Sequence, residues 1–224
     1  WDASAWIVDI KTRKTTRIFP KLTIHGPWES SCAWSPDGTR IAAIIPDEPS
    51  PYIAILDLSS GDITELRPQL KGIRFPDWSP SGDYLLVGGD PHDAGELWRV
   101  PLSGGSPRPL NTGGVGGTIA RHSPDGNWIA FEGHSMADSA RDWRSTRVVI
   151  VNAQGGIPVD ITTETSFGKG ISFTQVQSLS WTPDSQKILG EFRNVHDLKT
   201  AEKRKINTLA LVDTSGENYR SLIN

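Results

Sequence analysis

Three histidines with acidic neighbours are the residues of this sequence best suited to chemistry. They are His92, His134 and His196, and the acids near them are Asp90, Asp93, Asp138, Asp142 and Asp197. Imidazole and carboxylate ligands together suit ions such as Zn²⁺ or Mn²⁺. No close ligand pair such as His-x-x-x-His is present, so polar side chains in water explain the same residues. A metal site at His92, His134 and His196 is therefore an alternative, and no cofactor is expected.

The polar segment 133–146 offers a different kind of site. It contains Trp143, with Arg141 and Arg144 on either side. Trp and Arg are over-represented among the residues that carry the binding energy of protein interfaces. The alternative is that Trp143 folds back onto its own sheet. We take Arg141, Trp143 and Arg144, together with the three histidines, as candidate binding residues for a protein or a small ligand.

Composition argues against several other functions. The chain of 224 residues has a formal net charge of -3 and a pI of about 6.0, which gives no electrostatic footprint for nucleic acid. No apolar run approaches the ~18 residues of a membrane span. The Gly-x-Ser-x-Gly elbow of serine hydrolases is absent, and the single Cys32 allows no intrachain disulfide. We expect no nucleic-acid partner, no membrane span and no catalysis by this chain alone.

A five-residue turn sequence recurs along the chain and must position these candidates. Its four copies are Trp34-Ser35-Pro36-Asp37-Gly38, Trp78-Ser79-Pro80-Ser81-Gly82, His122-Ser123-Pro124-Asp125-Gly126 and Trp181-Thr182-Pro183-Asp184-Ser185. The prolines are 44, 44 and 59 residues apart, and a period of this size indicates a repeat architecture. Proline presets φ, Asp bonds its own backbone and Gly takes a positive φ in such turns. We therefore predict a positive φ at Gly38, Gly82 and Gly126.

Each turn joins the first two strands of a four-stranded unit. Apolar β-branched and aromatic runs bounded by Gly, Ser and Asp predict four short strands per unit, named a, b, c and d in chain order. The predicted complete units are 31–66, 74–110, 117–162 and 176–222. Residues 1–20 match only strands c and d of a unit. The chain is thus predicted to be one all-β domain, 1–224, of antiparallel sheets ordered a-b-c-d.

These units resemble a known repeat. Trp-Ser-Pro-Asp-Gly, an apolar strand, Val-Asp-x-x-Gly and a final Leu resemble the TolB-type, WD-like β-propeller repeat, and the stretch from Val212-Asp213 to Leu222 is a close match. The resemblance implies a β-propeller with four complete blades and the outer half of another, forming an open or partial ring. It also favours a periplasmic or extracellular location. By this resemblance the complete ring has roughly six to eight blades, within the range known for propellers, so the remaining blades are expected from a longer parent chain or from a segment that a structure does not describe.

A second resemblance is narrower. The run from Trp128-Ile129 to Gly133-His134, the long polar loop and Gly155-Gly156 look like a blade from the propeller of prolyl-oligopeptidase-family enzymes. Those enzymes carry their nucleophile on a separate α/β-hydrolase domain, for which this chain has no sequence.

Strand order divides the connections between two faces. The a–b and c–d turns lie at one end of the strands, the tight-turn face, and the b–c and d–a connections lie at the other, the long-loop face. The long connections 20–30, 133–146, 163–175 and 193–205 all belong to the long-loop face. His92, His134 and His196 are expected in the b–c loops of successive blades, and His25 in a d–a loop. Because binding residues favour loops on a rigid scaffold, this face is the predicted binding face; tolerated insertions are the alternative.

Residues at the end of strand a have a structural interpretation. Trp34, Trp78 and Trp181 are expected to pack between blades rather than to hold a ligand. His122 takes the place of Trp in the third unit, and we expect it to keep the packing role with an added hydrogen bond.

The predicted function is a non-catalytic propeller that binds a protein or a small ligand on its long-loop face. One alternative is the substrate-gating propeller of a prolyl-oligopeptidase-family serine peptidase whose catalytic domain is absent here. A weaker alternative is a metal-dependent lyase or hydrolase with a histidine-lined mouth.

Overall fold

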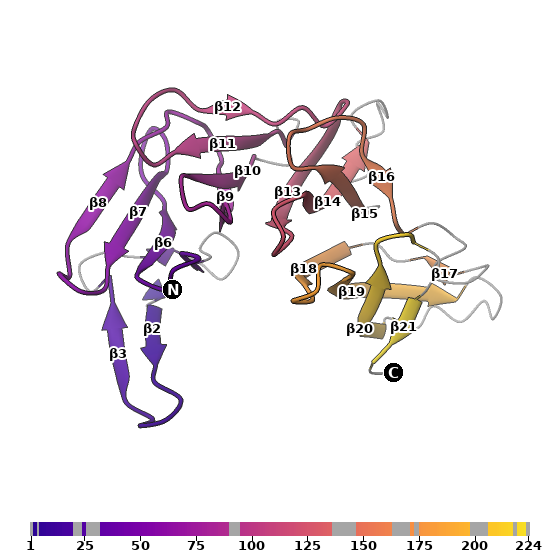
Figure 1. The fold of residues 1–224 in the computed structure, drawn as a ribbon, viewed down its shortest axis with the longest axis horizontal. Coiled ribbons are helices and arrows are strands. Elements are labelled where there is room, and N and C mark those ends of the chain that lie inside the picture. The colour runs from indigo at the N-terminus through magenta and orange to yellow at the C-terminus, as the bar shows by residue number, and fades with distance from the viewer. Residues whose placement is uncertain are drawn as a thin grey trace.

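The structure, a computed structural model, contains only strands and turns in the part of the chain that it describes. The described residues are 2–3, 5–19, 24–25, 32–89, 95–135, 147–162, 171–172, 175–197, 206–216 and 219–222. Four antiparallel sheets follow one another around an open arc (Figure 1). The predicted β-propeller fold class is confirmed. The assignment of 1–224 to a single domain with the stated unit boundaries stays a prediction.

Each sheet is one blade, with its strands hydrogen-bonded in chain order. Blade 1 comprises β5 (Cys32–Trp34), β6 (Arg40–Ile45), β7 (Tyr52–Asp57) and β8 (Ile63–Leu66). Blade 2 comprises β9 (Arg74–Trp78), β10 (Tyr84–Gly88), β11 (Leu97–Pro101) and β12 (Arg108–Pro109). Blade 3 comprises β13 (Val115–His122), β14 (Trp128–Ser135), β15 (Arg147–Asn152) and β16 (Val159–Asp160). Blade 4 comprises β18 (Gln175–Trp181), β19 (Lys187–Asp197), β20 (Ile206–Asp213) and β21 (Tyr219–Ser221).

The N-terminal residues form the half unit that the sequence indicates. Strands β2 (Ala5–Val8) and β3 (Thr15–Ile18) pair in a two-stranded hairpin. Two short pairings were not predicted: β1 (Asp2–Ala3) pairs with β4 (Ile24–His25), and β17 (Ile171–Ser172) pairs with the far end of β19.

The turns after strand a have the geometry that their sequence predicts. Gly38, Gly82 and Gly126 have φ values of 70°, 72° and 75°, which confirms the expected left-handed conformation. In the first turn, the Ser35 hydroxyl donates to Asp37 Oδ1 at 2.6 Å and accepts the Arg40 backbone N–H at 2.9 Å. The turn is therefore stabilised by hydrogen bonds among its own residues.

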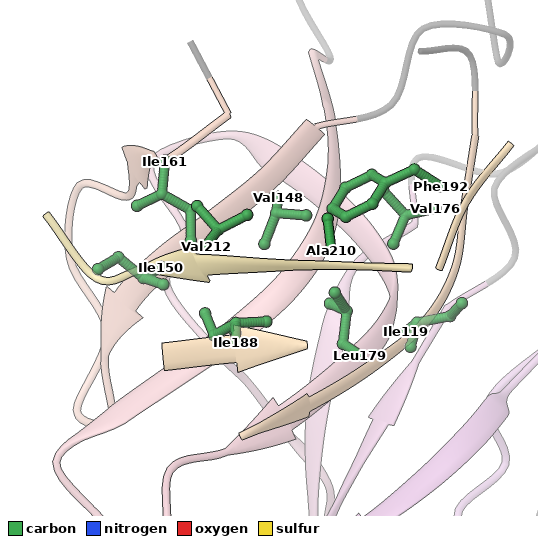
Figure 2. Packing of buried hydrophobic residues seen from close by; sticks show 11 residues of the cluster. Ile119, Val148, Ile150, Ile161, Val176, Leu179, Ile188, Phe192, Ala210 and Val212 are labelled. Carbon is green, nitrogen blue, oxygen red and sulfur yellow. The ribbon is translucent and has the colours of Figure 1, made fainter. Parts of the chain in front are cut away.

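Apolar side chains fill the spaces between successive blades. In blades 1 and 3 both faces of the b and c strands are buried over most of their length, so these strands are continuous apolar runs, whereas buried and partly exposed residues alternate in β19 and β20 of blade 4. Between blades 3 and 4, Ile119, Val148 and Ile150 pack with a set from the following blade that includes Leu179, Ile188, Ala210 and Val212 (Figure 2). Equivalent clusters join blade 1 to blade 2 and blade 2 to blade 3. Each blade is thus held by the apolar surface of its neighbours.

Candidate functional site

At the long-loop face, the b strands of blades 3 and 4 extend further than those of blades 1 and 2. Strands β14 and β19 have eight and eleven residues, whereas their counterparts β6 and β10 have six and five. The extension is possible because each strand finds a partner there. His134 is paired with Gly116 of β13, and His196 is paired with Ser172 of β17.

The prediction that His134 and His196 lie in b–c loops is therefore wrong, because both lie within strand b. Their end of the blade is nevertheless the predicted one. The registers put them at the b–c end of their strands, whereas the c–d turns that contain Gly61, Gly105, Gly156 and Gly216 follow the opposite end of strand c.

The other predicted binding residues lie outside the described residues. These are His92, Arg141, Trp143 and Arg144; for His134 and His196 only the backbone is described. Whether the six side chains converge thus stays a prediction. Within the described ranges, no group of three or more His, Cys, Asp or Glu residues is arranged to hold a metal ion, and the metal alternative at the three histidines is untested.

One acidic residue near the long-loop face was missed by the sequence reasoning. Glu132 in β14 is only 7% exposed, and the Thr118 hydroxyl of β13 donates a hydrogen bond to its Oε2. A carboxylate inside the apolar run that begins at Trp128 was the available signal, because an acid is seldom fully buried without a partner.

On the tight-turn face, the tryptophans that end strand a join neighbouring blades. Trp78 Nε1 donates to the backbone oxygen of Ala33 in blade 1 at 2.9 Å, and Trp181 Nε1 donates to that of Arg121 in blade 3 at 2.9 Å. Each acceptor directly precedes the residue that ends strand a in the earlier blade. Trp34 is 53% exposed. The predicted packing role is confirmed for Trp78 and Trp181.

His122 makes the corresponding junction between blades 2 and 3 with polar contacts. Its Nδ1 and its backbone nitrogen both lie 2.8 Å from Asp77 Oδ2, and Asp77 occupies the position equivalent to Ala33. Its Nε2 lies 2.8 Å from the hydroxyl of Tyr84, with the two rings edge to face at a centroid distance of 5.5 Å. The prediction that His122 keeps the packing role with an added hydrogen bond is confirmed. Burial raises the pKa of Tyr84.

A cleft opens beside this junction. Its volume is about 490 Å³, within the range of roughly 300–1,000 Å³ found for ligand pockets. Its lining comes from the a–b turns of blades 2 and 3, from Tyr84, Arg99 and His122, and from Ala153 and Gln154 in the c–d turn of blade 3. The cleft therefore lies on the tight-turn face, opposite to the predicted binding face.

The turn carboxylates on this face are stabilised in their ionised form. Hydrogen bonds from the Ser35 hydroxyl, and then from Thr39, lower the pKa of Asp37 to about 2. The pKa values of Asp83, Asp125 and Asp184 are lowered in the same way, first by the hydroxyls of Ser81, Ser123 and Thr182 respectively. These carboxylates stabilise their own turns, and because their lowered pKa values keep them ionised, they are poor general acids.

Comparison with known proteins identifies the fold. No protein-family model matches the sequence. The putative TolB from Agrobacterium tumefaciens superposes with a TM-score of 0.70 at 16% identity, over 99% of this chain and 74% of that one. TolB from Acinetobacter baumannii gives a TM-score of 0.67 at 16% identity, over 98% of this chain and 50% of that one. The fold is that of a TolB-like β-propeller.

Two further proteins are similar to this TolB-like propeller. An uncharacterized protein, Atu1656 of Agrobacterium fabrum, is 26% identical over 157 residues, which is 69% of this chain and 52% of that protein. The structure of a puromycin hydrolase S511A mutant complexed with PGG gives a TM-score of 0.58 at 16% identity, over 86% of this chain and 28% of that one. The TolB-like propeller thus spans about half the length of the curated relative that it matches. Within its described ranges there is no helix with the length and apolar character that a membrane crossing requires.

Proposed function

We propose that this TolB-like propeller is a non-catalytic binding domain that holds a protein or a small ligand on its long-loop face. The binding residues would be His92, His134, Arg141, Trp143, Arg144 and His196. The observation that carries the proposal is the extension of β14 and β19 at this face, where each strand continues beyond the length of its counterparts. Regular backbone that reaches past the core gives binding loops a rigid base.

The two faces also differ in how their polar groups are used. On the tight-turn face, the acids and hydroxyls of the a–b turns are hydrogen-bonded within their own turns, as Asp37 and Ser35 are. On the long-loop face, the connections are longer and in sequence include His92, Arg141, Trp143 and Arg144, while His134 and His196 lie at the b–c ends of β14 and β19. The long-loop face therefore offers the more varied set of side chains to a partner.

The test is a loop replacement in the 224-residue chain. Residues 136–146 are exchanged for a short Gly-Ser linker, and a double variant Arg141→Ala, Arg144→Ala is made alongside. A partner is first recovered by affinity capture with the native chain, and its dissociation constant is then measured for each variant. The control is Arg108→Ala, an exposed arginine in β12.

We expect the loop replacement and the double variant to weaken binding at least tenfold, while the control leaves it unchanged. The unfolding midpoint should change little, because shortening a surface loop alters the closure entropy by less than about 1 kcal/mol. Unfolding of the loop variant with native affinity per folded molecule would mean that the segment is structural packing, and the proposal would be dropped for this loop.

A second candidate function is the substrate-gating propeller of a larger serine peptidase. It is favoured by the structural similarity to puromycin hydrolase, of which this chain covers 28%. The full-length gene separates the two functions, because a gating propeller needs an α/β-hydrolase domain on the same chain. Labelling of the full-length protein by a fluorophosphonate probe would support the peptidase, and absence of that domain would exclude it.

A further inference from the structure

The three blade junctions can be compared at one equivalent position on the tight-turn face. Trp78, His122 and Trp181 each end strand a and reach back to the preceding blade. At the first junction, the indole of Trp78 is 5% exposed, and the Arg40 guanidinium lies 4.8 Å from its ring centroid. The indole therefore fills the space between blades 1 and 2 and is covered by a cation from the earlier blade.

The middle junction has an imidazole where the other two have an indole. His122 lacks the fused six-membered ring of Trp, and contacts with Asp77 and Tyr84 hold it in place, with its side chain only 3% exposed. The 490 Å³ cleft lies beside this side chain. The other two junctions have the larger indole at this position.

The walls of the cleft suit a flat ring. Tyr84 contributes an aromatic ring, Pro80 a saturated ring and Arg99 a planar guanidinium whose Cζ lies 5.8 Å from the Tyr84 centroid. Arg99 is fixed because its Nη2 donates to the backbone oxygen of Ala153 in blade 3. Guanidinium groups and aromatic edges both attract the faces of aromatic rings.

The cleft is also preformed. Its two sides belong to blades 2 and 3, which are joined beneath it by buried side chains that include Leu86, Ile129 and Phe131, each 0% exposed. The turns also approach each other closely, because a Cβ placed on Gly126 would lie 3.6 Å from Pro80 Cγ. A ligand therefore does not have to separate the blades, and preformed sites bind at a lower entropic cost.

The rim of the cleft favours a ligand with a hydrogen-bond donor. Asp77 Oδ2 accepts the backbone N–H of His122 and lies 2.8 Å from Nδ1 of the ring. The Tyr84 hydroxyl lies 2.8 Å from Nε2, so the polar groups of the junction are already paired with one another. The exposed carboxylates of Asp83 and Asp125 at the rim are acceptors for a ligand N–H or O–H.

We propose that the cleft between blades 2 and 3 binds a single aromatic ring that carries an N–H or O–H donor, with indole as the best fit. The ring would lie beside His122, against Tyr84 and Arg99. The same chemistry is found in a free small molecule and in a Trp side chain of a peptide. The site lies on the face opposite to the long-loop residues, so its test is independent of the test of the proposed function.

The experiment titrates the 224-residue chain with N-acetyltryptophanamide, with indole and with a five-residue peptide that has Trp at its centre. Binding is followed by saturation-transfer NMR and by calorimetry, with N-acetylleucinamide as the apolar control. We expect saturable binding of the aromatic probes and none of the leucine probe. A peptide that binds more tightly than the amide identifies a polypeptide as the source of the ring, and equal or weaker binding identifies a free small molecule.

Two variants connect the binding to the cleft. His122→Trp should fill it and weaken binding at least tenfold, with the circular dichroism spectrum of the native chain. Arg99→Ala should weaken binding about fivefold, because the cation–π contact is lost, while Arg108→Ala, its paired neighbour in β12, should not. If His122→Trp does not fold, the comparison of Arg99→Ala with Arg108→Ala decides. Absence of saturable binding, native affinity in folded His122→Trp, or equal effects of the two arginine variants would overturn the proposal.

Discussion

The contact between Gly88 and Thr118 gives a sharp test of how closely blades 2 and 3 approach. Gly88 ends β10 near the long-loop face. A Cβ added to it would lie 1.9 Å from the backbone oxygen of Thr118 in β13, and 2.6 Å from its carbonyl carbon. Both atoms belong to strand backbone, so no side chain can turn away to make room. Gly88→Ala therefore requires the two blades to move apart.

The size of the effect follows from these distances. Contacts of a Cβ below 3.0 Å are essentially never found, so the strands must separate by roughly 1 Å or more. Overpacking of a core typically costs 1–3 kcal/mol. Because both partners here are strand backbone, we expect a loss of about 3 kcal/mol or more. For a chain of this length that corresponds to a fall in Tm of roughly 6–12 °C.

The assay is urea denaturation followed by far-ultraviolet circular dichroism, with a thermal scan as a second measurement. The control is Gly38→Ala, where φ is 70° and a Cβ would meet nothing within 4 Å. We expect a loss of about 1 kcal/mol there, from the left-handed backbone alone. If Gly88→Ala loses no more stability than Gly38→Ala, the close approach of β10 and β13 is not a feature of the folded protein.

Three further outcomes are expected. Ser35→Ala should raise the pKa of Asp37 from about 2 toward 3.8. Because the pKa of Asp37 is lowered in the folded state, the ionised carboxylate stabilises the fold above pH 3.8, and this stabilisation is lost as the pH falls through about 2. An Asp37 pKa that NMR titration finds unchanged in the variant would contradict the role of the Ser35 hydroxyl. Trp78→Phe should cost about 2 kcal/mol, from one hydrogen bond and buried apolar surface, whereas Trp34→Phe should cost less than about 0.5 kcal/mol; similar urea midpoints for the two would refute the junction role of Trp78. Tyr84→Phe should cost about 1–2 kcal/mol by leaving His122 Nε2 without its partner, and Tyr52→Phe, whose buried ring lies under Arg67, is the control for which we expect little change.

The parts of the fold that depend on local chemistry were predictable from the sequence. The Ser-Pro-Asp-Gly turns specify their own geometry, so the positive φ of Gly38 and the order of strands in each blade could be predicted. The pairing of β17 with β19 could not, because two residues, Ile171 and Ser172, carry no periodicity. The lengths of β14 and β19 were underestimated for a related reason: polar residues stay in a strand when a partner strand is present to pair with them.

The candidate sites divide in the same way. The role of His122 could be inferred from its place in the repeat, since the residues around it match those around Trp78. Its partner Asp77 could not be inferred, because Asp77 lies 45 residues earlier in the chain. At the other two junctions the equivalent acceptors are the backbone oxygens of Ala33 and Arg121, which any residue type would provide. The cleft lies between residues of blades 2 and 3, and the burial of Glu132 depends on how the sheets pack. Both features arise from tertiary packing, which the repeat pattern of the sequence does not specify.

The junctions between blades have a direction. In each of the three described junctions, the later blade supplies the donor and the earlier blade the acceptor, through Trp78, His122 and Trp181. The series of four complete blades therefore has unlike ends. One is the indole of Trp34 in blade 1, the blade that packs against the half unit of β2 and β3, and the other is the backbone that precedes Trp181 in blade 4. A sheet that continues this pattern must offer an acceptor to the first end or a donor to the second. Contact between two such donor positions related by a twofold rotation would leave both indoles without an acceptor.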